Sequence, residues 1–375
     1  MSVGTSLDRH IAVVRTGVLA GSLIFAFGLF GSSPALAQNC GMAGPLIAPA
    51  AAWSAGIAIS NAITAANTAF LGQSTAFVSA PGNPKANSEG AGIWIRGVGG
   101  ELTTNSSAHV VQAITTAPNR TLFFSGPCND QFHQTFGGFQ LGTDMAKLNV
   151  GGWNLTLGPT AGFLQTNGNI VGGNSVLGTS PFNSTTQAPF VGTYGHASYG
   201  NFFVDGIVRA DYFQTVLNSP AGSQLILNPV SGALVPTAAI NFANQRVDTH
   251  GFTVAASTGY NWQVPNSSWF IEPSAGVIWS REAVDPFGVA GQTGALTSTP
   301  QNPNVFASGT VKVNDIESIM GRAGLRVGTT METSDVVYSP FVAASVWHDF
   351  GSRITTNWGL CPGCDFGMPV TSSMS

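Results

Sequence analysis

The stretch "NFFVDGIVRADYFQ" at residues 201–214 decides the fold, because its charged residues all occupy odd-numbered positions. They are Asp205, Arg209 and Asp211, whereas the even-numbered positions carry no charge and include Val208. Side chains of a β-strand alternate between the two faces of the sheet. The stretch therefore predicts a strand with one charge-free face and one charged face, and the fold depends on which solvent each face contacts.

The composition argues against two classes of protein, an ordinary soluble domain and a nucleic-acid-binding protein. Charged residues make up 8% of the 375 residues, against about a quarter in ordinary soluble domains. Hydrophobic residues make up 43%, and there are 47 glycines. The formal net charge is −4 and no basic stripe is present, so a nucleic-acid partner is not expected.

The N-terminus has the pattern of a secretory signal peptide. Arg9 and Arg15 precede the apolar run "TGVLAGSLIFAFGLFG" (16–31), and the small residues "ALA" (35–37) follow it. A membrane anchor is the alternative, but the short run and the cleavage site favour a signal peptide over residues 1–37. The mature chain is therefore expected to leave the cytoplasm.

Alternating strands dominate the rest of the chain, which contains no apolar run long enough for a membrane-spanning helix. Nine strands are predicted, at 92–103, 134–147, 153–163, 187–199, 201–214, 249–262, 269–281, 316–328 and 336–350. They are longer than the usual five or six residues or so, and reach the roughly 9–11 needed to cross a bilayer at a tilt. Aromatic residues such as Trp153, Tyr212 and Trp279 lie near their ends. These features predict an all-β, antiparallel outer-membrane β-barrel, with a secreted β-sandwich as the alternative.

The connections between these strands alternate in length. Long polar stretches lie at 104–133, 164–186, 217–248 and 282–315, and short ones at 148–152, 200–201, 263–268 and 329–335. Outer-membrane barrels have short periplasmic turns and long external loops. The charge-free face is therefore expected to contact outer-membrane lipid and the charged face to line the lumen. The charges predicted to face the lumen are Arg96, Asp144, Asp205, Arg209, Asp211, Glu272, Arg322 and Arg326.

Residues 47–77 precede the first strand, are rich in alanine and contain no charge. High alanine content favours a helix, and Trp53, Ile57, Ile63 and Phe70 are near helical spacing. A small, uncharged helix suits a barrel lumen, so we predict a helix that plugs it; an irregular Ala-rich linker is the alternative. Residues 79–90 are a turn-rich linker.

The chain resembles the autotransporter β-domain family over about residues 47–350. The matching stretches are "IWIRGVGG" (93–100), "GGFQLGTD" (137–144), "FFVDGIVRADYF" (202–213), "FIEPSAGVIWS" (270–280) and "GRAGLRVG" (321–328). The resemblance implies a barrel of about 12 strands with an N-terminal helix in its lumen. It also implies a translocator and anchor for surface-exposed segments, and assembly by machinery that recognises a last strand ending in an aromatic residue.

The chain departs from the family pattern at both ends. Residues 38–90 hold the plug helix and linker but no passenger domain. The barrel region, 91–375, shows about nine strands and ends in "DFGMPVTSSMS" with no terminal aromatic strand. Bacterial single-chain barrels have an even number of strands, and open sheet edges are unfavourable in lipid. We therefore predict a barrel that lacks about three final strands.

A search for catalytic and metal-binding patterns yields little. Cys361 and Cys364 form "CPGC", for which a local disulfide is favoured over a redox motif, and Cys40 and Cys128 could pair in an oxidising compartment. No metal site, cofactor or enzyme activity is predicted. The resemblance raises self-cleavage at a plug asparagine, for which Asn61 or Asn67 with the acidic lumen residue Glu272 are the candidates, but the missing passenger argues against it.

The sequence thus predicts an outer-membrane barrel of a diderm bacterium that acts as a translocator or anchor. A porin-like channel and a non-functional truncated remnant are the alternatives. A lipid-hydrolysing enzyme is a weaker one, because no nucleophile and base can be paired.

Overall fold

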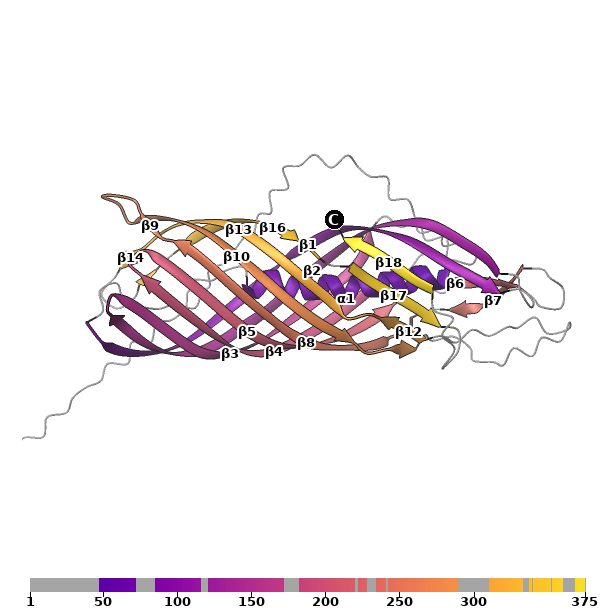
Figure 1. The fold of residues 1–375 in the computed structure, drawn as a ribbon, viewed down its shortest axis with the longest axis horizontal. Coiled ribbons are helices and arrows are strands. Elements are labelled where there is room, and N and C mark those ends of the chain that lie inside the picture. The colour runs from indigo at the N-terminus through magenta and orange to yellow at the C-terminus, as the bar shows by residue number, and fades with distance from the viewer. Residues whose placement is uncertain are drawn as a thin grey trace, which may run out of the picture.

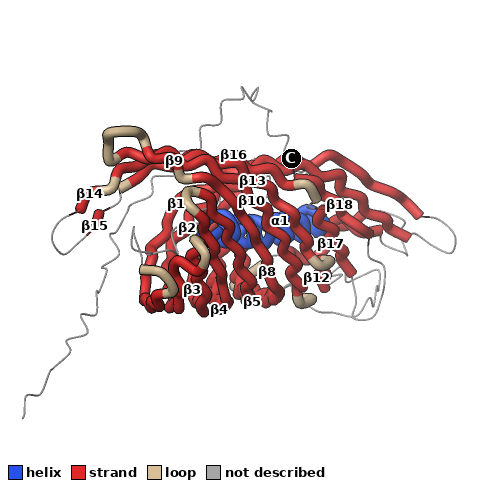
Figure 2. The backbone as a smooth tube through the Cα atoms, turned by 60° about the vertical axis from the view of Figure 1, so that its left-hand side comes forward, coloured by secondary structure: helices blue, strands red, loops and turns tan. Residues whose placement is uncertain are grey.

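The computed structural model shows one curled antiparallel sheet with a helix running through its interior (Figures 1 and 2). The residues described are 47–71, 85–115, 121–171, 182–219, 222–227, 234–240, 242–288, 310–332, 337–338, 340–351, 353–359 and 368–374. The predicted signal peptide at 1–37 lies outside them.

Nine long strands make up most of the wall, and each pairs with the next of them along the chain. They are β1 (Ser88–Thr115), β2 (Thr121–Val150), β3 (Trp153–Val171), β4 (Asn183–Tyr199), β5 (Phe202–Asn218), β8 (Gln245–Tyr260), β10 (Trp269–Val284), β13 (Ile316–Thr329) and β16 (Phe341–Asp349). All nine overlap the strands predicted from the sequence.

Shorter strands extend or flank this sheet. β9 (Trp262–Gln263) pairs with β10; β11 (Phe287–Gly288), β12 (Thr310–Val313), β17 (Arg353–Gly359) and β18 (Met368–Met374) follow one another across the sheet, and β18 pairs with β1. Two small hairpins are formed by β6 (Gly222–Leu227) with β7 (Leu234–Ile240), and by β14 (Met331–Glu332) with β15 (Val337–Tyr338).

Glycines form two of the tight turns at one end of the barrel. Gly151 and Gly152 both have positive φ between the paired residues Val150 and Trp153, which a two-residue type I′ turn requires. Gly200, with φ of 55°, begins the two-residue turn between β4 and β5. We call this the inner end and the opposite end the outer end.

The alternation predicted for residues 201–214 is confirmed. In β5 the odd-numbered side chains from Phe203 to Asp211 are buried, while even-numbered ones such as Val204, Val208 and Tyr212 are exposed. Apolar side chains on the outer face of other strands are exposed in the same way, including Leu157 on β3 and Val277 on β10. The wall therefore has an apolar exterior, and its interior holds the charged side chains together with apolar ones such as Ile207 and Phe213.

The helix α1 (Ile47–Leu71) lies inside the sheet and carries no charged residue. The side chains of its residues Trp53, Ile57, Ile63 and Phe70 are buried, so the predicted plug helix is confirmed over 47–71. Residues 72–77 lie outside the described part of the chain. In the described part of the chain, no helix has both the length and the hydropathy needed to span a bilayer.

Two predictions about the strands need correction. The stretch 104–133 was expected to be a loop, but β1 and β2 continue through it as a paired hairpin to Thr115 and Thr121. Likewise, 217–248 contains the β6–β7 hairpin. Polar residues do not end a strand where the backbone groups of a partner satisfy its hydrogen bonds. β17 and β18 were also missed: both are short, and β17 precedes the cysteine-containing segment at 361–364 whereas β18 follows it.

Candidate functional site

The candidate site is the contact between α1 and the inner face of the wall. A row of directly opposed residues on three neighbouring strands faces the helix: Arg209 on β5 lies opposite Thr253 on β8, which lies opposite Ser280 on β10. Asp211, two residues after Arg209, points to the same side of β5. All four side chains are buried.

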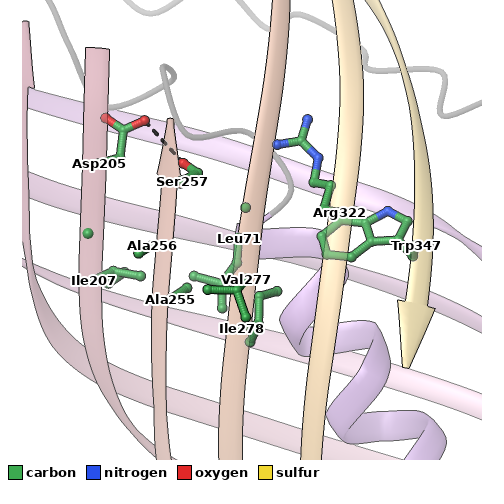
Figure 3. Close-up of a pocket in the computed structure, with 12 residues that line it drawn as sticks. Leu71, Asp205, Ile207, Ala255, Ala256, Ser257, Val277, Ile278, Arg322 and Trp347 are labelled. Carbon is green, nitrogen blue, oxygen red and sulfur yellow. Dashed lines mark hydrogen bonds between the residues drawn. The ribbon is translucent and has the colours of Figure 1, made fainter. Parts of the chain in front are cut away.

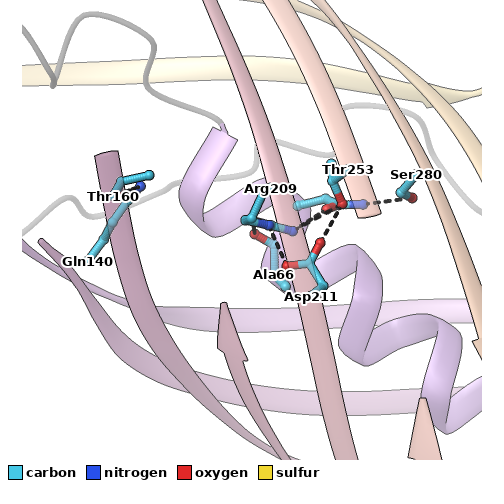
Figure 4. A network of polar contacts seen from close by, with 8 residues as sticks. Ala66, Gln140, Thr160, Arg209, Asp211, Thr253 and Ser280 are labelled. Carbon is cyan, nitrogen blue, oxygen red and sulfur yellow. Dashed lines mark hydrogen bonds and ion pairs between the residues drawn. The ribbon is translucent and has the colours of Figure 1, made fainter. Parts of the chain in front are cut away.

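Arg209 joins this row to the helix (Figure 4). Its Nη2 donates to Asn67 Oδ1 at 2.8 Å and its Nη1 to the Ala66 carbonyl oxygen at 3.4 Å. Its Nε lies 2.6 Å from Asp211 Oδ1, but the N–H is not aimed at that oxygen, so the contact is ionic. We call Arg209, Asp211, Thr253, Asn67 and Ser280 the Arg209 cluster.

Two further hydrogen bonds link the members of the Arg209 cluster. Thr253 Oγ1 donates to Asp211 Oδ2 at 2.7 Å, and Asn67 Nδ2 donates to Ser280 Oγ at 3.2 Å. A fully buried charge is tolerated when it is paired and hydrogen-bonded. The Arg209 cluster meets this condition only with the helix in place, because Asn67 and the Ala66 carbonyl belong to α1.

A second arginine binds the C-terminal end of the helix. Arg96 on β1 donates from Nη2 to the Phe70 carbonyl oxygen at 2.7 Å and also to Gln140 on β2. Gln140 Nε2 in turn donates to Thr160 Oγ1 on β3 at 3.0 Å. The last carbonyls of a helix lack intrahelical donors and carry partial negative charge. A guanidinium at this position therefore stabilises the helix end within the barrel.

Aromatic packing reinforces the same contact. The Phe70 and Phe190 rings are 4.7 Å apart, and the Arg209 guanidinium lies 5.0 Å from the Phe190 ring. The helix is thus held by hydrogen bonds, cation–π contact and apolar burial together.

The other predicted lumen charges face inward but form separate groups with the wall. Glu272 pairs with Arg326 at 2.6 Å, and Asn261 Nδ2 donates to Glu272 Oε2 at 2.9 Å. Asp144 accepts from Tyr194, whose hydroxyl accepts from Trp94. Arg96 and Arg209 thus contact α1, whereas the Glu272–Arg326 pair joins the neighbouring strands β10 and β13, and the Trp94–Tyr194–Asp144 chain joins β1, β4 and β2.

A small cavity of about 20 Å³ lies beside Leu71, the last residue of α1 (Figure 3). Asp205 and Ser257 flank one side of it, and Arg322, stacked 5.7 Å from the Trp347 ring, flanks the other. Asp205 also pairs with His196 on β4. The sequence could have revealed the His196–Asp205 pair, because the two-residue turn at 200–201 fixes the register of β4 against β5.

Other expectations have no outcome in the described residues. Cys40, Cys361 and Cys364 lie outside them, as does the side chain of Cys128, so the expected disulfides are not placed. Glu282, which the sequence analysis did not single out, is fully buried, and its carboxylate has no hydrogen-bond partner among the described residues. Across the same part of the chain, no cluster of three or more His, Cys, Asp or Glu side chains could hold a metal ion.

Comparison with known proteins identifies the family. The family model described as the autotransporter beta-domain matches residues 125–358, more than half of the chain. The chain belongs to the autotransporter β-domain family. Autotransporter β-domains are outer-membrane barrels that serve as translocators and anchors. They are not a class of enzymes.

Solved autotransporter β-domains show distant similarity. The β-domain of the Bordetella autotransporter BrkA is 18% identical, with 73% of this chain and 96% of that chain covered and a TM-score of 0.37. The translocator domain of the autotransporter NalP from Neisseria meningitidis is 11% identical, with 86% and 95% covered and a TM-score of 0.35. No curated protein matches the chain.

Proposed function

We propose that this autotransporter β-domain resides in the outer membrane of a diderm bacterium as an anchor whose lumen is kept closed by α1. Export would use residues 1–37, the apolar exterior would contact outer-membrane lipid, and the barrel-assembly machinery would insert it. The Arg209 cluster carries the proposal, because the buried Arg209 guanidinium donates a hydrogen bond to Asn67 of the helix, and Asn67 in turn donates to Ser280 of the wall.

A conductance experiment tests the closed lumen. The full chain is purified from outer membranes, reconstituted into planar bilayers, and compared with a variant that lacks residues 47–71. We expect little conductance from the full chain and a large, steady conductance from the deletion variant, because α1 fills the barrel interior.

The alternative outcomes are informative. A large conductance from the full chain would overturn the closed lumen and favour a porin-like channel. Absence of the full chain from the outer-membrane fraction, with intact protein elsewhere, would contradict the proposed location and leave the role of α1 to be measured in detergent.

A further inference from the structure

Glu282 on β10 is a buried acidic residue outside the Arg209 cluster. Its side chain is fully buried, and neither oxygen of its carboxyl group has a hydrogen-bond partner among the described residues. An ionised carboxylate is costly to bury without a partner, and such a group takes up a proton instead. The surroundings of Glu282 therefore decide which form it adopts.

A second carboxyl group, that of Asp211, lies beside Glu282 on the inner face of the wall. Gly251 of β8 is directly opposite Asp211 on β5 and directly opposite Glu282 on β10. A Cβ at Gly251 would overlap Glu282 Oε2, so the Glu282 side chain lies across the glycine, in the direction of Asp211. The glycine thus leaves the space in which the two carboxyl groups approach each other.

One arginine serves both carboxyl groups. Arg209 contacts Asp211 through its Nε, and its Nη1 and Nη2 donate to the Ala66 carbonyl oxygen and to Asn67 of α1. The helix carries no charge. The neighbouring inward-facing positions are uncharged as well: Thr249 on β8, Ser280 and Val284 on β10, Val313 on β12, and Ile316 and Ser318 on β13. With both carboxyl groups ionised, this part of the wall would hold an uncompensated negative charge away from water.

The helix α1 passes Glu282 on the lumen side. Asn67 donates to Ser280, two residues from Glu282 on the same face of β10. Nearer the N-terminus of α1, Gly56 packs against Thr356 of β17, which lies beyond Glu282 toward the outer end. The part of α1 between these two contacts therefore lies at the level of Glu282. Because the carboxyl group is fully buried, water reaches it when this part of the helix moves away.

We propose that Glu282, beside Asp211, is a proton-binding site that makes the seating of α1 depend on pH. With α1 in place the Glu282 carboxyl group holds a proton. When α1 moves away, the hydrated group releases this proton at neutral pH, as an ordinary glutamate does. Raising the pH therefore favours the displaced helix, by at most about tenfold per pH unit for one proton. This inference concerns how α1 is held and does not depend on whether the lumen conducts.

Infrared spectroscopy of the unmodified full chain in detergent tests for the proton directly. Exposed carboxyl groups are ionised at about pH 7, so a carboxylic acid that remains protonated at this pH is a buried one. We expect its C=O stretching band in the folded chain and the loss of that band in Glu282→Gln, whose amide has nearly the shape of the protonated acid. Absence of the band from the unmodified chain, or its persistence in the variant, would overturn the proposal.

Hydroxyl-radical labelling of Trp53 measures the seating of α1. Trp53 is 1% exposed, whereas the outward-facing Trp269 is 52% exposed and serves as the internal reference. Mass spectrometry gives the urea concentration at which Trp53 becomes labelled, at several values between about pH 5 and pH 9. We expect this concentration to fall as the pH rises for the unmodified chain, and to fall less for Glu282→Gln.

Glu317→Gln is the matched control variant. Glu317 is an exposed, outward-facing acidic residue on the neighbouring strand β13, where it accepts a hydrogen bond from Trp279. Its replacement should leave the pH dependence of Trp53 labelling unchanged. An equal pH dependence in the unmodified chain and in Glu282→Gln would overturn the link between this proton and α1, and so would a urea concentration that rises with pH.

Discussion

At the scale of the residue, burial determines what an ion pair contributes. Arg209 and Arg281 each pair with an aspartate, at 2.6 and 2.9 Å. Arg209 is fully buried beside the helix, whereas the Arg281–Asp315 pair is about half exposed on the outer face. The same pairing of side chains therefore has a structural role in the first case and contributes little in the second.

We expect Arg209→Ala to lower the free energy of unfolding by about 3–5 kcal/mol, because it leaves Asp211 buried without its cation. Arg281→Ala is the control and should change it by about 1 kcal/mol or less. Urea unfolding in detergent, followed by tryptophan fluorescence, measures both. Similar losses for the two variants would show that the Arg209 cluster does not hold the barrel together.

Glycines in the wall differ in how closely the next strand approaches. A Cβ at Gly158 would overlap the carbonyl oxygen of Thr143 on β2, whereas nothing lies within 4 Å of a Cβ at Gly137. We expect Gly158→Ala to destabilise the barrel by about 1–3 kcal/mol through overpacking, and Gly137→Ala to be nearly neutral in the same unfolding assay. A neutral Gly158→Ala would mean that the β2–β3 pair can separate at little cost.

At the scale of the element, the fit of α1 depends on one close approach to the wall. A Cβ at Gly56 would lie 3.0 Å from Thr356 Cγ2 and 3.2 Å from Ile354 Cγ2, both on β17. This contact leaves no room for a larger side chain on that side of the helix. The position of Thr64 is less crowded, since its side chain is only partly buried.

We expect Gly56→Leu to displace α1 from β17 and to make Trp53 accessible to chymotrypsin, because the added side chain has no space. Thr64→Leu, on the same helix, should leave Trp53 protected. Mass spectrometry of the digested, detergent-solubilised protein distinguishes the two. Protection of Trp53 in both variants would indicate that the helix can shift without leaving the lumen.

The sequence predicted which segments form strands better than it predicted where the strands end and which residues they pair with. Alternation identified which face of β5 and β8 is buried, because the two faces contact different surroundings. It could not show that β1 and β2 continue as a hairpin beyond the apolar belt, where polar side chains carry no alternating signal. The Glu272–Arg326 pair needed the register of β10 against β13, which the sequence does not contain.

At the scale of the whole molecule, the exterior changes from apolar to polar along each strand. On the outward face of β5, Val208 is 50% exposed near the middle of the strand, Tyr212 follows, and Gln214 lies beyond it toward the outer end. Arg281 likewise follows Trp279 on β10. Aromatic residues at this boundary are typical of the edge of a lipid belt.

The depth of the lipid belt predicts costs of different size, in free energy of unfolding, for the same substitution at two positions of β5. Val208→Arg should cost about 2–4 kcal/mol in lipid bilayers, because the charge is placed near the centre of the hydrocarbon, whereas Gln214→Arg, beyond Tyr212 on the same face, should cost about 1 kcal/mol or less. Unfolding measured in phospholipid vesicles gives both values. Equal costs in vesicles would mean that the exposed apolar face of the wall does not contact lipid, which would contradict membrane insertion by these strands.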